Sequence, residues 1–474
     1  MEEEMCLRRF GIIPESVWGD QTETIVYAQV IRRHPGGVAI FRFYRNPRHS
    51  PKSLANRIVS CYHDINVQDY TLSFRDRVDM RSGIWSSIAA VWHRCSRDPN
   101  FFAPGTVIDL SSDDNDGLIW CAYRSPLFDE YLGLLRHIQR SDLVPLGNSA
   151  RTIDISQIYF PRSMGGGGCN KEAHVHDIGH SMSFFFKGID FATYLKLHDD
   201  DNEVIRAAVE TWRRSSKLVA GMPPHPYFQQ SPKMLVSILD LNGNSVLMGH
   251  LSTFYRRGDL ASVIQKANSG KTQLSLREKA GWCYDMSQVV AHTHRILHTF
   301  HMDINPGNFL LGAGKRLHLI DWEQRSPTVA TLAPEADGTC DVHEETKDEG
   351  TRLVYTKYTG PPRRNMPKGS RSAILNGWNV FPDWQVNCPR ATELAEVFAL
   401  GRTMWMLLTQ TVSGFEEVKH PKDVRVTWDG ENIIPSHWID MVERCMERDP
   451  NKRPEVEDLV KFWRHEESLL DKKP

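Results

Sequence analysis

The sequence lacks any pairing pattern among its cysteines. The nine cysteines are odd in number and scattered along the chain, and no two of them stand in C-x-x-C spacing. A disulfide framework and a structural zinc site both depend on grouped or paired cysteines. We therefore expect a fold that depends on its hydrophobic core, with thiols that stay reduced.

Long apolar runs and a surplus of one charge are also missing. No segment approaches the roughly 18 uninterrupted apolar residues of a membrane-spanning helix, and no apolar stretch follows the initial Met-Glu-Glu-Glu as in a signal peptide. The formal net charge of −2 gives no indication of a nucleic acid or an anionic membrane as partner. We expect a cytoplasmic or nuclear protein with neither kind of partner.

The length and composition indicate a globular protein of several domains. The chain has 474 residues, of which 40% are hydrophobic and 24% charged. A single core rarely holds so long a chain, so two or three domains are expected. Residues 1–150 are typical of a mixed α/β region, but they contain no catalytic cluster, so their function stays open.

Residues 151–173 are predicted to be a glycine-rich linker. They include Gly165-Gly166-Gly167-Gly168. A loop that cradles phosphate needs a strand before it and a strand or helix after it, but these glycines are followed by Cys-Asn-Lys-Glu-Ala-His. We therefore favour the linker over a phosphate-binding loop.

The centre of the chain carries residues suited to phosphoryl transfer. Asp303 follows His301 in a predicted turn, Asn308 comes five residues later, and Asp321 ends an apolar strand. An aspartate held in a turn accepts a proton from an attacking hydroxyl, and an asparagine and a second aspartate hold a metal ion against a triphosphate. The alternative is a loop that happens to contain these residues between a helix and a β-hairpin.

This pattern, H-x-D-x-x-x-x-N followed by an apolar strand that ends in Asp, resembles the catalytic core of the protein-kinase superfamily. The resemblance implies an α+β, bilobal fold, with a small β-rich N-lobe at residues 174–255 and a large helical C-lobe at residues 256–470, preceded by the N-terminal α/β region. It also implies ATP and Mg²⁺ as cofactors, Asp303 as the base, and Asn308 and Asp321 as metal ligands.

Two further motifs of the C-lobe match the same family. Ala333-Pro334-Glu335 resembles the motif that closes the activation segment, and Cys445 to Pro454 matches C-x-x-x-D-P-x-x-R-P. In the family the arginine pairs with the glutamate, so Glu335 and Arg453 are expected to form a buried ion pair. Glu396 stands where the family has an anchoring aspartate. Residues 342–392 are expected to be an insertion that is either a regulatory element or disordered.

The resemblance also suggests nucleotide-binding residues in the N-lobe. Gly179 and Ser181 fall in the best candidate for the turn that covers the nucleotide. Lys196 lies in a run, Phe191 to Leu197, that we interpret as the third strand, whose lysine pairs with the phosphates and with a helical glutamate. For that glutamate we favour Glu210 over Glu203. Met248 and His250 are assigned to the hinge that binds adenine.

The resulting hypothesis is an ATP- and Mg²⁺-dependent kinase that phosphorylates a Ser or Thr hydroxyl of a protein. Two alternatives remain. The glycine turn keeps only the first glycine of the family pattern, and the triplet Asp321-Trp322-Glu323 replaces Asp-Phe-Gly, as in a pseudokinase that serves as a scaffold. Asn305 stands where serine/threonine kinases carry a lysine near the γ-phosphate, which bears on the rate and on the class of acceptor. The same triplet also resembles small-molecule kinases of the aminoglycoside and choline kinase type.

Overall fold

The computed structural model describes most of the chain, and its residues fall into two compact units. Unit 1 comprises Met1–Arg213 and Pro232–Phe254, and unit 2 comprises Arg214–Ser231 and Tyr255–Pro474. The residues described are 12–19, 24–32, 37–67, 74–98, 101–112, 118–145, 147–164, 169–175, 182–198, 203–229, 231–324, 327–347, 350–360, 380–415, 418–428 and 433–471.

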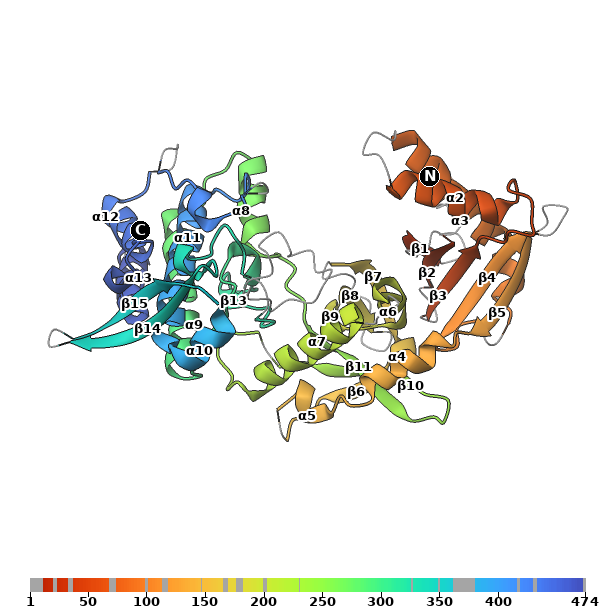
Figure 1. The fold of residues 1–474 in the computed structure, drawn as a ribbon, viewed down its shortest axis with the longest axis horizontal. Coiled ribbons are helices and arrows are strands. Elements are labelled where there is room, and N and C mark those ends of the chain that lie inside the picture. The colour runs from red at the N-terminus through yellow and green to blue at the C-terminus, as the bar shows by residue number, and fades with distance from the viewer. Residues whose placement is uncertain are drawn as a thin grey trace. The chain divides into compact units, whose positions relative to one another are not determined.

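Unit 1 begins with a five-stranded sheet in the order β1-β2-β3-β4-β5 (Figure 1). Its strands are β1 (Ile12–Gly19), β2 (Ile25–Arg32), β3 (Gly37–Tyr44), β4 (Thr106–Ser112) and β5 (Leu118–Arg124). The β3–β4 pair is parallel, and a parallel pair needs a long crossover connection. The helices α2 (Leu54–Val67) and α3 (Phe74–Cys95) supply it, and both contribute apolar residues to the core on this sheet.

A second sheet of six strands follows in the same unit, in the order β6-β10-β11-β9-β8-β7. Its strands are β6 (Arg151–Asp154), β7 (Ile158–Ser163), β8 (Asn170–Val175), β9 (Phe184–Gly188), β10 (Met234–Leu239) and β11 (Ser245–Thr253). The shorter helices of unit 1 are α4 (Leu127–Leu135), α5 (Arg140–Leu143), α6 (Phe191–Leu197) and the 3₁₀ turn η1 (Ile155–Gln157).

The predicted linker at residues 151–173 is wrong. These residues contain β6, β7 and most of β8, and β7 pairs with β8 in antiparallel register. Alternate residues of β8 are buried, because one face of the strand covers the core while the other carries polar side chains. Because half of its residues are polar, β8 was not recognised as a strand in the sequence after the four glycines.

The two sheets of unit 1 share one hydrophobic core. Trp18 and Tyr27 of the first sheet belong to the same buried cluster as Phe160 and Phe186 of the second. The α4 helix extends this core, since the hydroxyl of Tyr131 donates a hydrogen bond of 2.8 Å to the carbonyl of Ile189. The N-terminal region is therefore built onto the second sheet.

Unit 2 is mainly helical and is confirmed as the helical part of the predicted α+β fold (Figure 1). Its helices are α8 (Leu260–Ser269), α9 (Leu276–Arg295), α10 (Phe381–Asn387), α11 (Pro389–Thr409), α12 (Ser436–Cys445) and α13 (Val456–Asp471). The α7 helix (Glu203–Gly221) begins in unit 1 and ends in unit 2. Ser275 and Glu278 form a capping box that starts α9, and α11 is buried around nearly its whole circumference.

Short strands and 3₁₀ turns connect these helices. They are the hairpins β12 (Phe309–Leu311) with β13 (Leu317–Leu319) and β14 (Cys340–Lys347) with β15 (Gly350–Lys357), and the turns η4 (Pro306–Asn308), η5 (Pro334–Ala336), η7 (Pro421–Asp423) and η8 (Pro450–Lys452).

The expected insertion at residues 342–392 contains much of the β14–β15 hairpin, α10 and the first residues of α11. The hairpin is attached at Leu353, whose N–H and carbonyl bond to the side chain of Asn451 at 2.8 and 3.1 Å. Residues 361–379 lie outside the described residues. Within the described residues, no helix combines the length and apolar character needed to cross a lipid bilayer.

Candidate active site

Asp303 lies in a tight turn that joins α9 to β12. Asn305 caps the 3₁₀ turn η4, because its Oδ1 accepts a hydrogen bond of 2.8 Å from the N–H of Gly307. The Nε2 of His301 lies 2.7 Å from the carbonyl oxygen of Ile320, just after β13. The turn is therefore held both internally and against the following hairpin.

The carboxylate of Asp303 is held by a hydrogen bond at each oxygen. Oδ1 accepts from the N–H of Thr328 at 2.7 Å, and Oδ2 accepts from the Nδ2 of Asn308 at 3.0 Å. Burial raises the pKa of Asp303 above its ordinary value, although His301 and Thr328 act in the opposite direction. A carboxylate with a fixed orientation and a raised proton affinity has the properties of a general base.

The two predicted metal ligands lie on neighbouring segments. The carbonyl of Asn308 accepts a hydrogen bond of 3.0 Å from the N–H of Ile320, the residue before Asp321. The hydrogen bonds that the Asn308 side chain makes within the described chain use its Nδ2 and leave Oδ1 available. An amide oxygen and a carboxylate are ligands that Mg²⁺ prefers, so these residues fit the predicted metal.

Asp321 adopts a backbone conformation that non-glycine residues rarely take. Its φ is +67°, in the left-handed region. The next residue, Trp322, is buried, with its ring centroid 4.7 Å from that of His301 and 5.5 Å from that of Phe228. This packing anchors the chain directly after Asp321 and maintains the unusual conformation.

Glu396 anchors the turn as the family's aspartate is expected to do. The N–H of Met302 donates to its Oε1, and the Nε2 of His294 lies 2.7 Å from its Oε2. All of these groups are buried. The central helix α11 therefore holds the catalytic turn through a side chain that is one methylene longer than the aspartate it replaces.

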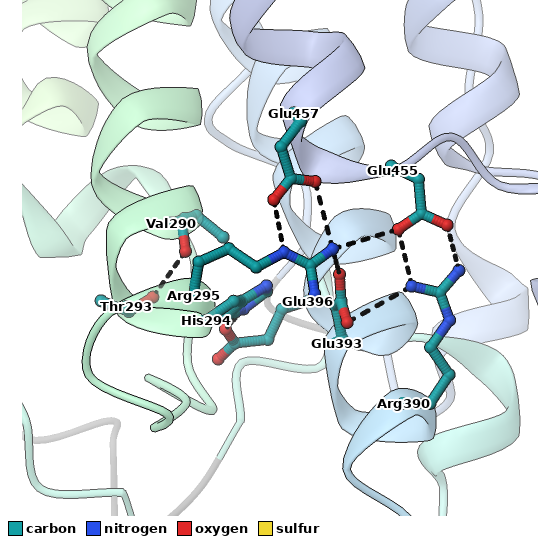
Figure 2. Close-up of polar contacts among 9 residues, drawn as sticks. All are labelled: Val290, Thr293, His294, Arg295, Arg390, Glu393, Glu396, Glu455 and Glu457. Atoms are coloured by element: carbon teal, nitrogen blue, oxygen red, sulfur yellow. Dashed lines mark hydrogen bonds and ion pairs between the residues drawn. The ribbon is translucent and has the colours of Figure 1, made fainter.

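An ion-pair network joins α9, α11 and α13 beside this anchor (Figure 2). Arg295 pairs with Glu393, Glu455 and Glu457, and Arg390 pairs with Glu393 and Glu455. The three carboxylates lie close enough together to bind a cation. Each of the three carboxylates already pairs with a guanidinium group, so we interpret the cluster as structural.

The predicted pair of Glu335 and Arg453 is confirmed. Both terminal nitrogens of Arg453 donate to the two carboxylate oxygens of Glu335, and the NH1 nitrogen also donates to the carbonyl of Leu394 at 3.0 Å. The Arg453 side chain is fully buried. This bidentate pair connects the segment after the active site to the turn before α13.

The predicted strand lysine, Lys196, is wrong. Phe191–Leu197 is the helix α6, not a strand, and Lys196 lies in its last turn. The helix starts there because the carboxylate of Asp190 accepts a hydrogen bond of 2.8 Å from the N–H of Thr193 and thereby caps it. The aromatic and β-branched residues of this run favoured a strand, but the cap overrides that weak preference.

Lys187 is a lysine that does lie on a strand, and the sequence analysis did not consider it. It lies on β9, is largely buried, and stands opposite His250 of β11 in the antiparallel register. The signal was present, because Phe184-Phe185-Phe186-Lys187 is an apolar run ending in lysine, as in the V-A-I-K pattern of the third kinase strand.

The predicted glycine turn stays a prediction. Gly179 and Ser181 lie outside the described residues, and the predicted turn at residues 178–186 overlaps β9 at Phe184. The four glycines at 165–168, rejected earlier for want of a following strand, connect β7 to β8 in the sequence. They have the required strand on each side.

The hinge prediction for Met248 and His250 is wrong, because both residues lie inside β11 and are buried. The strand continues to Thr253, and the boundary between the two units falls after Phe254. Burial and the nearby Lys187 lower the pKa of His250 to about 3, so it stays neutral.

Glu210 lies on α7, as predicted. Its carboxylate accepts hydrogen bonds of 3.0 and 3.2 Å from the guanidinium of Arg213. Pairing of Glu210 with the strand lysine stays a prediction.

Comparison with known proteins identifies protein kinases as relatives. No family model matches the sequence. The chain is 26% identical over 198 residues to dual specificity protein kinase zak2 of Dictyostelium discoideum, which covers 40% of this chain and 24% of that protein. It is 25% identical over 196 residues to human mitogen-activated protein kinase kinase kinase 7, which covers 39% of this chain and 25% of the relative.

The chain thus spans about a quarter of the length of these relatives. Their similarity, together with a β-rich unit and a helical unit of the expected kind, identifies the chain as protein-kinase-like in sequence and fold.

Proposed function

We propose that the chain is an ATP- and Mg²⁺-dependent phosphotransferase that transfers the γ-phosphoryl group of ATP to a Ser or Thr hydroxyl of a protein substrate. The observation that carries the proposal is the doubly hydrogen-bonded carboxylate of Asp303, held by Asn308 and by the backbone of Thr328. The two relatives are named a dual specificity protein kinase and a mitogen-activated protein kinase kinase kinase, and both names describe enzymes that phosphorylate proteins. This supports a protein as the acceptor.

Each residue has a separate role in the proposed reaction. Asp303 orients the attacking hydroxyl and accepts its proton, and its raised pKa suits that step. Asn308 and Asp321 would hold Mg²⁺, which when bound neutralises charge on the phosphates. Lys187 is assigned to the α- and β-phosphates.

A scaffold without catalysis is the second candidate, and a specific observation favours it. Asn305, which replaces the lysine of serine/threonine kinases, donates a hydrogen bond of 3.1 Å to Thr328 and carries no positive charge for the γ-phosphate. A lost charge of this kind lowers stabilisation of the transition state.

Nucleotide binding is tested by thermal unfolding. ATP with Mg²⁺ is expected to raise the melting temperature more than ATP with EDTA, because ligand that binds only the native state stabilises it. Asp321→Asn is expected to show the same melting temperature with ATP and Mg²⁺ as with ATP and EDTA. The control Asp440→Asn, at an exposed position on α12, is expected to keep the wild-type difference between the two conditions. Equal shifts with Mg²⁺ and EDTA in the wild type would contradict the metal assignment.

A further inference from the structure

A cavity of about 300 Å³ lies in unit 1, lined by residues of β1, β2, β7, β8 and α6. Glu15, Trp18 and Gln29 line it from the first sheet, and Arg162, Lys171 and Lys196 line it from the second sheet and α6. All of these elements belong to one compact unit.

The cavity is on the opposite face of the second sheet from Lys187. Lys171 of β8 stands directly across from Phe186 of β9, so their side chains share a face of the sheet. Neighbouring residues of a strand point to opposite faces, and Lys187 follows Phe186. A ligand in the cavity is thus separated by the sheet from the proposed phosphate-binding lysine.

A β-bulge directs Glu15 to this place. The pairing of β1 with β2 shifts register between Pro14 and Ser16, so that Glu15 is the extra residue. Bulges of this kind re-aim a side chain and are frequent next to binding sites. The Oε2 of Glu15 is buried and has no hydrogen-bond partner among the described residues.

Two neutral N–H donors that line the cavity also lack hydrogen-bond partners. The indole Nε1 of Trp18 and the amide Nε2 of Gln29 are buried without a hydrogen-bond partner in the described part of the chain. Buried polar atoms in folded proteins nearly always have a partner, so three such atoms around one cavity indicate a ligand or water that satisfies them.

The charges of the lining limit the kind of ligand. Lys171 pairs with Asp190 at 2.5 Å, and Arg162 pairs with Glu172 at 2.8 Å. Glu15 and Lys196 have no ion pair within the described residues. Burial raises the pKa of Glu15, and the ammonium groups of Lys171 and, to a smaller extent, Lys196 act in the opposite direction. The cavity thus presents one free carboxylate, one free ammonium group and two N–H donors.

We propose that this cavity binds a free α-amino acid, with its ammonium group at Glu15 and its carboxylate accepting hydrogen bonds from Trp18, Gln29 and Lys196. A zwitterion matches one unpaired charge of each sign, and the flat indole of Trp18 offers an apolar wall to the ligand's side chain. The site does not depend on the proposed kinase activity.

Thermal unfolding of the full chain with each of the common amino acids, at roughly 10 mM, tests the proposal. At least one amino acid is expected to raise the melting temperature, and its N-acetyl and methyl ester derivatives are expected to lose the effect because each lacks one of the two charges. If no amino acid changes the melting temperature, or if both derivatives raise it as much as the parent amino acid does, the proposal is wrong.

Calorimetric titration of variants locates the site. Glu15→Gln and Lys196→Met are each expected to weaken binding by about tenfold or more, since each removes a charged hydrogen bond. Asp129→Asn, a change at a partly exposed ion pair of the same unit, serves as the control and retains wild-type affinity. Lys196 lies at the exposed end of α6, so Lys196→Met is informative even if Glu15→Gln fails to fold. Wild-type affinity of Lys196→Met for the amino acid would show that the ligand binds elsewhere.

Discussion

At the scale of single residues, two lysines of unit 1 lie in different surroundings. Lys187 lies on β9 opposite the buried and neutral His250. Lys196 lies nine residues later on α6 and lines a cavity on the other face of the sheet. The difference follows from the local fold, because β9 ends at Gly188 and Asp190 then starts a helix.

Lys187→Met is therefore expected to abolish the rise in melting temperature that ATP with Mg²⁺ produces, and to lower phosphoryl transfer by at least about 10²-fold, in the range of a lost transition-state charge contact. Lys196→Met, the matched control, should keep both within about twofold, or ~0.4 kcal/mol. The reverse result would restore Lys196 as the phosphate-binding residue.

At the scale of elements, buried ion pairs and histidines connect segments that are distant in the sequence. Glu335 and Arg453 join η5 to η8, and Glu396 joins α11 to the catalytic turn. His225, in the segment after α7, stacks on His292 of α9 with ring centroids 4.2 Å apart. The Glu335–Arg453 pair and the His225–His292 contact each lead to a prediction about the stability of the fold.

Arg453→Ala should lower the free energy of unfolding by about 3–5 kcal/mol, because it leaves the Glu335 carboxylate buried without its partner. The control is Lys461→Ala, which removes an exposed pair with Asp458 and should change stability by about 0–1 kcal/mol. Urea unfolding at pH 7 measures both, and equal values for the two variants would contradict the buried pair.

The histidine contact predicts loss of stability in acid. Burial, together with the neighbouring His292, lowers the pKa of His225 to about 4 in the folded chain, from an ordinary value of 6.5. Between these two values the unfolded chain binds more protons than the folded chain, so the free energy of unfolding falls as the pH falls from about 6.5 to about 4.

His225→Phe keeps an aromatic ring but cannot bind a proton, so its melting temperature should depend less on pH over this range than that of the wild type. If the melting temperatures of the two proteins change equally with pH, the pKa of His225 is not lowered in the folded chain. The comparison between the proteins removes the contribution of all other titrating groups.

The sequence predicted the elements of unit 2 better than those of unit 1, for a physical reason. The long helix α9 has a capping box and a regular apolar face, and the residues of the catalytic turn follow one another at fixed spacing. In unit 1 the strands β7 and β8 are short and half polar, and a capped helix, α6, follows β9 after two residues. Short elements carry little periodicity, so residues 151–173 were predicted to be a linker and residues 191–197 a strand.

At the scale of the whole molecule, the N-terminal region is an integral part of unit 1. Its first sheet shares a buried cluster with the second sheet through Trp18, Tyr27 and α4. The sequence analysis treated residues 1–150 as a separate region, since an α/β pattern alone does not reveal which face packs on another sheet. The two sheets are therefore held together by one shared core.

The central claim is that the chain transfers phosphate from ATP, and incubation with γ-labelled ATP and Mg²⁺ tests it most directly. Wild type, Asp303→Asn and Asp440→Asn are each given protein and small-molecule acceptors. The account predicts Mg²⁺-dependent label in protein with the wild type and with Asp440→Asn, and about 10²–10⁴-fold less with Asp303→Asn, the usual contribution of a general base. Binding of ATP by the wild type without transfer to any acceptor, or equal transfer by Asp303→Asn, would contradict it.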